Sequence, residues 1–125
     1  MASVLREFVI DCTDPELVAR WWGDVLGWPV VADDDGYWWS AMTGEPDAPA
    51  PVMVFVPVPE AKTVKNRIHL DLNPSGCDQA EELARLLALG ARPVDVGQRD
   101  VSWVVLADPE GNELCLLSQR IDPTT

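Results

Sequence analysis

Ionisable side chains alternate with apolar ones in the segment that opens the second half of the chain. Arg67, His69 and Asp71 occupy every second position there, and the residue that follows each of them is Ile or Leu. Successive side chains of a strand point to opposite faces, so the three ionisable groups are expected to share one face. Glu7 and Asp11 share one face of the first predicted strand in the same way. We interpret these five side chains as walls of a ligand-binding surface, and a solvated sheet face with an internally satisfied cluster is the alternative.

Tryptophan is the second unusual feature, with six residues in a chain of 125. Trp38 and Trp39 are adjacent in a predicted strand, so one ring is expected under a helix and the other in the ligand-binding surface. Trp103 lies at the corresponding place in the second half. Indole rings bind planar or cationic groups by stacking and cation–π contact, worth about 0.5–2 kcal/mol each. The alternative is that these rings fill the core or a subunit interface, and Trp22 is expected in the core.

Other catalytic chemistry has little support in the sequence. The chain contains a single histidine, and no spacing places a nucleophilic serine or cysteine beside it, although Cys115 is a candidate. No Gly-rich phosphate-binding loop occurs. The three cysteines are too few and too scattered for a disulfide framework or a Cys-x-x-Cys site. We therefore expect reduced, partly buried thiols and a cytoplasmic protein.

The charge of the chain restricts its partners. Nine Lys and Arg stand against 21 Asp and Glu, which gives a net charge of −12. We expect no nucleic acid and no membrane as partners, because binding phosphate groups requires clustered basic residues. No apolar run approaches the roughly 18 residues of a membrane helix, and no secretory signal is visible. The charge is compatible with a cationic ligand, and it also simply keeps a protein soluble.

The chain consists of two similar halves. Each half has one predicted helix that ends in Leu-Gly and continues into a strand through a proline, at Leu26-Gly27 and Leu89-Gly90. A hairpin turn is predicted at residues 33–36 and a proline-rich loop at residues 44–50. The order βαβββ occurs twice, so we predict an α+β fold in a single domain, residues 1–125, made of module 1 (1–61) and module 2 (62–125). The predicted strands cover residues 4–12, 28–32, 37–43 and 51–58, and then residues 65–72, 92–96, 101–107 and 113–118.

Both predicted helices have recognisable ends and apolar stripes. Asp14, followed by a proline, predicts the N-terminal cap of the first helix, and Asp78 that of the second. Gly27 and Gly90 fit left-handed C-terminal caps. The predicted buried stripes are Val18, Trp22, Val25 and Leu26 in the first helix and Ala80, Leu83, Ala84 and Leu87 in the second.

Several short motifs are spread over both halves. They are Asp14-Pro15, Trp21-Trp22, Leu26-Gly27-Trp28, Arg67-Ile68-His69-Leu70-Asp71, Leu89-Gly90 and the turn Asp108-Pro109-Glu110-Gly111-Asn112. Together they resemble the glyoxalase-like branch of the vicinal-oxygen-chelate superfamily, and the turn is their most specific piece. The resemblance implies paired βαβββ modules that form a curled sheet around a cleft, usually in a homodimer. Members include metal-dependent isomerases, lyases, dioxygenases and epimerases, and metal-free proteins that sequester antibiotics.

The resemblance also implies where a metal ion would bind. Metal-dependent members take ligands from the first and fourth strands of each module, which here means Glu7, residues 52–58, His69 and Cys115. Residues 52–58 contain no His, Asp, Glu or Gln, and Cys115 stands where a carboxylate is usual. Glu113 is displaced by two residues. We therefore expect no metal and no other cofactor; if a divalent metal ion binds, the implied ligands are Glu7, His69 and either Cys115 or Glu113.

Three functions stay open at this point. One is a relative of a fused regulatory domain that binds a protein partner, and another is a metal-dependent lyase, isomerase or dioxygenase of the same superfamily that uses His69 and Glu7. This fold hosts many chemistries, so the sequence does not decide whether the chain is an enzyme. We favour a glyoxalase-like protein that binds a small cationic or aromatic molecule in its cleft without a complete metal site, through Glu7, Asp11, Arg67, His69, Asp71, Trp38, Trp39 and Trp103.

Overall fold

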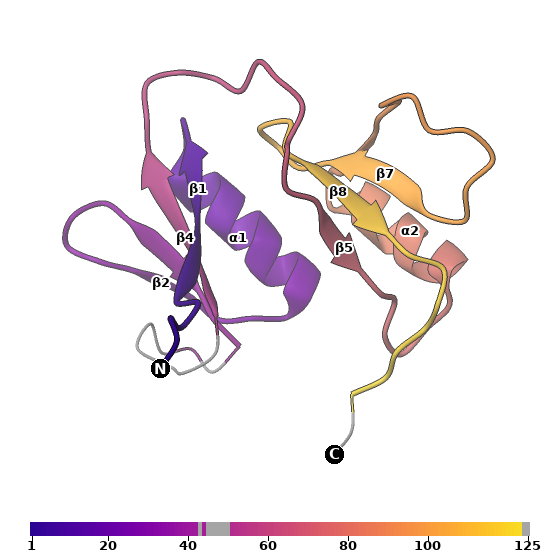
Figure 1. Cartoon of the computed structure of the whole chain (residues 1–125), viewed down its shortest axis with the longest axis horizontal. Coiled ribbons are helices and arrows are strands. Elements are labelled where there is room, and N and C mark those ends of the chain that lie inside the picture. The colour runs from indigo at the N-terminus through magenta and orange to yellow at the C-terminus, as the bar shows by residue number, and fades with distance from the viewer. Residues whose placement is uncertain (43, 45–50, 124–125) are drawn as a thin grey trace. The chain divides into compact units, whose positions relative to one another are not determined.

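Each half of the chain folds around its own four-stranded sheet (Figure 1). The two units are Met1–Ala61 and Lys62–Thr125. The computed structural model describes residues 1–42, 44 and 51–123. Most of the predicted proline-rich loop, together with Thr43, lies outside the described residues. Among the described helices, none has the length and apolar character that crossing a membrane requires.

Unit 1 places its first and fourth strands side by side. Its sheet runs in the order β1-β4-β3-β2, with β1 parallel to β4 and the other pairs antiparallel. Helix α1 covers one face of this sheet. The elements are β1 (Glu7–Cys12), α1 (Pro15–Leu26), β2 (Val30–Ala32), β3 (Trp38–Ser40) and β4 (Val52–Pro57).

Unit 2 repeats this topology. Its sheet runs in the order β5-β8-β7-β6, again with the first and fourth strands parallel and the other pairs antiparallel. The two βαβββ modules of an α+β fold are thus confirmed, with strands shorter than predicted. The elements are β5 (Leu70–Leu72), α2 (Gln79–Ala88), β6 (Arg92–Pro93), β7 (Val104–Ala107) and β8 (Glu113–Leu116).

Short-range signals in the sequence set the helix ends. The Asp14 carboxylate accepts a hydrogen bond from the Leu17 N–H at 3.2 Å, and the Asp78 carboxylate accepts one from the Glu81 N–H at 2.9 Å. Each bond satisfies a backbone donor that has no partner within the helix. Gly27 ends α1 in the left-handed conformation, with φ of 69°. The caps predicted for both N-termini and for the end of α1 are confirmed.

Helix α1 packs closely on its sheet. Val18, Trp22 and Val25 of the predicted stripe are buried. A Cβ atom on Gly23 would overlap Val30 Cγ2 and would lie 3.0 Å from the Trp28 carbonyl oxygen. Only glycine therefore allows α1 to approach β2 at this separation.

The stripe predicted for α2 is wrong. Leu87 is 40% exposed, and Ala80 and Ala84 are exposed as well. Leu86 is fully buried instead, and Leu83 beside it is half-buried. The helix carries two overlapping apolar stripes that share Leu83, and the folded unit buries the one that contains Leu86.

The strand predicted at residues 65–72 is wrong in its first half, because β5 begins only at Leu70. Asn66 donates its backbone N–H to the Glu113 carboxylate at 3.0 Å rather than to a neighbouring strand. The chain bends at Arg67 and Ile68, and Ile68 is 70% exposed. Ile68 therefore does not pack against a helix, contrary to the alternation of the sequence.

The turn before β8 is held by a buried carboxylate. Asp108 is fully buried, and its oxygens accept hydrogen bonds from the backbone N–H groups of Glu110 and Asn112 and from the Asn112 amide, each at 2.9 Å. Pairing with three donors compensates for the burial of a charge. The motif at residues 108–112, the most specific one in the sequence, therefore has a structural role: its hydrogen bonds stabilise the turn before β8.

Candidate functional site

Trp39 lies on the face of the unit 1 sheet that α1 does not cover, which we call the helix-free face. Its cross-strand neighbours are Val54 of β4 and Val31 of β2, and Val9 of β1 lies beyond Val54. Cross-strand partners share a face, so these four side chains form one apolar row. At the two ends of the row, Val9 and Val31 are 56% and 38% exposed, whereas Val54 between them is buried. Trp39 was predicted as part of the ligand-binding surface, whereas Val31 and Val54 were not, because each lies in a run of apolar residues without alternation.

The Trp39 ring is fixed by the hairpin turn that precedes it. Its indole N–H donates to Asp33 Oδ2 at 3.1 Å, while Asp33 Oδ1 accepts from the backbone N–H groups of Asp35 and Tyr37. Desolvation opposes ionisation of Asp33, but the hydrogen bonds from Trp39, Tyr37 and Asp35 outweigh it and lower the pKa of this carboxyl. The ring is thus held in place before any ligand binds.

Trp38 lies on the opposite face of β3, as the alternation predicts. It pairs with Phe55, which is fully buried, and the Arg20 guanidinium of α1 lies 5.0 Å from the centre of its ring. Trp38 is therefore the tryptophan that packs toward the helix, and it does not line the helix-free face.

Glu7 and Asp11 flank the apolar row on the edge strand β1. They lie opposite Val52 and Val56 of β4 and share the face of Val9. Glu7 is half-buried, with Arg6 Nε 3.8 Å from its Oε1 atom, and Asp11 is exposed. Unit 1 thus offers an aromatic and apolar surface with two carboxylates at one edge.

The predicted site residues are divided between the two units. Glu7, Asp11, Trp38 and Trp39 belong to unit 1, whereas Arg67, His69, Asp71 and Trp103 belong to unit 2. Trp103 precedes β7 in a bend and is 41% exposed. His69 directly precedes β5, and Asp71 is the central residue of this strand.

In unit 2 the segment before β5 is tied to β8. Lys62 Nζ lies 2.9 Å from Glu113 Oε1, and the Asn66 N–H donates to Glu113 Oε2 at 3.0 Å. The Asn66 side-chain amide also donates to the Glu113 carbonyl oxygen at 3.4 Å. Desolvation opposes ionisation of Glu113, but Lys62 and Asn66 outweigh it and lower the pKa of this carboxyl. Lys62 and Asn66 were not predicted as site residues, because their partner Glu113 is about fifty positions away.

His69 pairs with a lysine rather than with a carboxylate. Lys65 Nζ lies 3.1 Å from His69 Nε2. An ammonium group can only donate, so Nε2 is the acceptor and the ring proton belongs on Nδ1. Lys65 was also missed, although three basic residues within six positions of an acidic chain are a visible signal.

Cys115 is buried beside Asp71, its partner across the β5–β8 ladder. Burial, followed by the charge of Asp71 and the hydrogen bond between the two side chains, raises the pKa of the Cys115 thiol. A thiol that keeps its proton is a poor nucleophile. This environment does not support the nucleophilic role considered for Cys115 with His69.

The sequence profile of the glyoxalase-like domain family matches residues 7–117. The chain belongs to this family. Its place in the vicinal-oxygen-chelate superfamily, which the short motifs indicated, is thereby confirmed. No functionally curated protein matches it by sequence.

Solved structures share the fold of this glyoxalase-like domain at low sequence identity. A variant of the fosfomycin resistance protein FosX from Listeria monocytogenes, complexed with Mn(II) and 1S,2S-dihydroxypropylphosphonic acid, has a TM-score of 0.69 at 12% identity over 95% of this chain and 94% of that chain. The oxidase ChaP-H2 has a TM-score of 0.66 at 17% identity over 95% of both chains. TnmS3, an antibiotic-binding protein from Streptomyces sp. CB03234, has a TM-score of 0.56 at 19% identity over 99% and 98%. At these identities the likeness concerns the fold.

The side chains of this glyoxalase-like domain do not fit the metal site that the family resemblance implies. Strand β4 has only valines on the helix-free face, and two of them, Val52 and Val54, are buried in an apolar cluster. In unit 2 the Glu113 carboxylate already accepts two hydrogen bonds, and His69 Nε2 lies beside the Lys65 ammonium, whose charge repels a cation. The Cys115 thiol holds its proton. Across residues 1–42, 44 and 51–123, no three His, Cys, Asp or Glu side chains are grouped to hold a metal ion.

Proposed function

We propose that this glyoxalase-like protein binds a small molecule without the help of a metal ion. The observation that carries the proposal is the chemistry of the strand positions from which metal-dependent members take ligands. Strand β4 offers valines, and the candidate ligands His69 and Glu113 are engaged by lysines. Binding a divalent cation here would require breaking these contacts and would still leave too few ligands.

The helix-free face of unit 1 is suited to a planar aromatic ligand. Trp39 supplies a ring already fixed by Asp33, so little side-chain entropy is lost when a ligand stacks on it. Val9 and Val31 extend the apolar surface on both sides. Glu7 and Asp11 favour a positive group at the β1 edge, which retains the expectation of a cationic or aromatic ligand for this unit.

In unit 2, we propose Arg67, His69, Asp71 and Trp103 as the candidate ligand-binding residues. We also propose that the chain forms a homodimer in the cytoplasm. Light scattering at micromolar concentration should then give about twice the 13.8 kDa of one chain. A mass of one chain would contradict the dimer and leave the binding proposal untouched.

Proflavine, a planar aromatic cation, tests the proposal on protein dialysed against a chelator. We expect proflavine to quench tryptophan fluorescence without added metal. Trp39→Leu should weaken the affinity about tenfold, because stacking and cation–π contact contribute about 1–2 kcal/mol. Trp38→Leu, on the opposite face of the same strand, is the matched control and should leave the affinity unchanged.

Two outcomes would overturn the proposal. One is equal affinity in the wild type and the Trp39→Leu variant. The other is about one Zn, Ni, Fe or Mn per chain by elemental analysis of protein purified without a chelator, lost in a His69→Ala variant. That second result would favour the alternative function, a metal-dependent lyase, isomerase or dioxygenase that uses His69 and Glu7.

A further inference from the structure

Residues 62–69, which we call the basic segment, differ from the rest of this acidic chain. Lys62, Lys65 and Arg67 are three of its nine basic residues and lie within six positions. The chain as a whole carries a charge of −12. The segment itself contains no Asp or Glu, and Glu113 of β8 forms an ion pair with Lys62. The local charge is therefore positive, opposite to that of the whole chain.

The basic segment is held in place although it has no regular secondary structure. Lys62 at its start and Asn66 at its middle are both bonded to Glu113, and His69 at its end runs directly into β5. Lys65 lies between two anchored positions. Its ammonium lies close enough to Cys115 to lower the pKa of that thiol, against the stronger effect of burial. These anchors limit the entropy that the segment loses when a ligand binds.

The cationic side chains of the basic segment are only partly neutralised by carboxylates. Both Glu113 oxygens accept from donors of the segment, and Asp71 is bonded to the Cys115 thiol. Lys65 donates one of its three N–H groups to the imidazole of His69, which carries no negative charge. Within the described residues, neither Lys65 nor Arg67 forms an ion pair with a carboxylate.

We propose that the basic segment binds an oxyanion carried by a small apolar molecule, with Lys65, Arg67 and the His69 Nδ1–H as donors. Oxyanions are the natural partners of ammonium and guanidinium donors that lack a carboxylate. Val64 and Ile68 are 74% and 70% exposed and offer apolar contact to the body of such a molecule. The inference rests on the proposed function, namely metal-free binding of a small molecule, and assigns the chemical class of the group that unit 2 binds.

The net charge of the chain makes the salt dependence of binding diagnostic. At long range the charge of −12 repels an anion, and this repulsion weakens as the screening length falls from about 30 Å at 0.01 M salt to about 8 Å at 0.15 M. Contacts at hydrogen-bond distance are screened much less. The affinity for an oxyanion at this segment should therefore hold or rise with salt over this range, whereas non-specific attraction of a cation falls.

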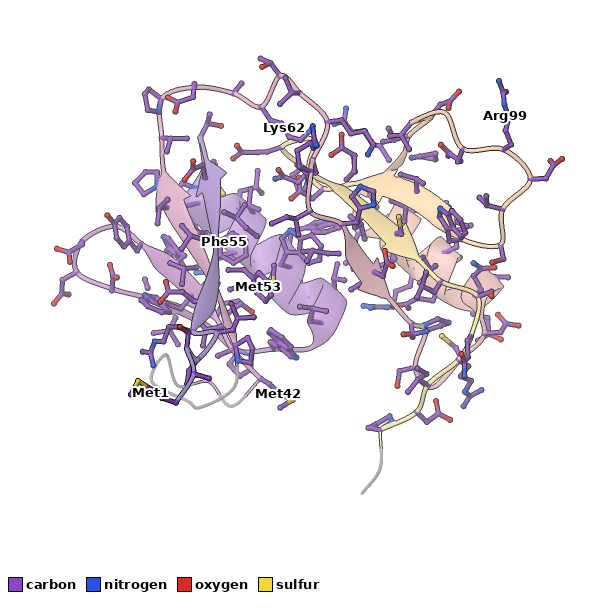
Figure 2. All side chains as sticks on the ribbon, in the orientation of Figure 1. Met1, Met42, Met53, Phe55, Lys62 and Arg99 are labelled. Atoms are coloured by element: carbon purple, nitrogen blue, oxygen red, sulfur yellow. The ribbon has the colours of Figure 1, made fainter. Side chains whose placement is uncertain are left out.

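Phenyl phosphate and benzoate, with benzylamine as the cationic counterpart, test the inference on metal-free protein by NMR titration. We expect both anions to shift the backbone amide signals of residues 64–71. Lys65→Met and Arg67→Met should each weaken the binding about tenfold, the effect of losing one charge-assisted hydrogen bond. Lys65→Arg should restore it. Arg99→Met is the control, since it changes the charge equally and Arg99 points outward from the loop between β6 and β7 (Figure 2).

Failure of this inference and failure of the proposed function would give different experimental results. If benzylamine shifts these signals and the two anions do not, the inference is wrong while the proposed function stands. Equal losses in Lys65→Met and Arg99→Met would likewise overturn it, because the effect would then be one of net charge. If phenyl phosphate binds only after a divalent metal ion is added, the proposed function fails as well, and the ligand is held by the metal.

Discussion

Replacing Glu113 by glutamine tests the contact that holds the basic segment on β8. The Glu113 and Lys62 side chains are 15% and 20% exposed. The free-energy contribution of their ion pair should therefore lie between that of a surface pair, about 0–1 kcal/mol, and the cost of disrupting a buried pair, about 3–5 kcal/mol. Glutamine keeps the shape of the side chain and one oxygen for the Asn66 N–H but loses the charge that attracts Lys62. We therefore expect Glu113→Gln to lower the free energy of unfolding by about 1–2 kcal/mol.

Urea denaturation of the wild type, Glu113→Gln, Lys62→Met and the double variant measures this contact as a coupling energy. We expect about 1 kcal/mol, because the two side chains interact directly. The exposed pair Arg20 and Glu16, at 60% and 51% exposure, is the control, and Glu16→Gln should cost less than about 0.5 kcal/mol. If the Glu113 and Lys62 variants were simply additive, the contact would not hold the segment and the argument for its preorganisation would fail.

The same contact predicts a dependence on pH. A carboxyl whose pKa is lowered by folding stabilises the folded state above its unfolded pKa, about 4.3 for Glu, and this contribution is lost as the pH falls through the folded value. The difference in stability between the wild type and Glu113→Gln should therefore be complete near neutral pH and should shrink below about pH 4. A difference that stayed constant in acid would show that the charge of Glu113 has no part in it.

Further predictions concern the framework that positions both surfaces. Gly23→Ala should destabilise the fold by about 1–2 kcal/mol, since overlap with Val30 outweighs the helix preference of alanine, and adding Val30→Ala should recover part of the loss in urea denaturation. Asp108→Ala should cost about 2–3 kcal/mol in the same assay, because it leaves the donors of the turn before β8 without their acceptor. Ser40→Ala should be neutral or slightly stabilising by thermal denaturation, because the buried Ser40 hydroxyl has no hydrogen-bond partner within the described part of the chain. A clear loss of stability in that variant would reveal a partner for the hydroxyl.

The sequence by itself determined the features that depend on neighbouring residues. The N-terminal caps at Asp14 and Asp78 and the C-terminal cap at Gly27 were predictable, because each satisfies backbone groups within one helical turn. The opposite orientations of Trp38 and Trp39 follow from the geometry of a single strand. The repeated order of elements, together with the short motifs, was sufficient to identify the superfamily.

Tertiary structure alone decided which of several local options was used. Helix α2 offers two apolar stripes, and only the folded unit decides that Leu86 rather than Leu87 is buried. The sequence pattern favours a strand at residues 65–72, but Glu113, which follows much later in the chain, binds Lys62 and Asn66 and ends the pairing early. These choices are set by contacts between residues that are distant in sequence, where the gain from burial or from a charged hydrogen bond exceeds local preference. The pairing of Lys62 with Glu113 belongs to the same class, because the two residues are 51 positions apart.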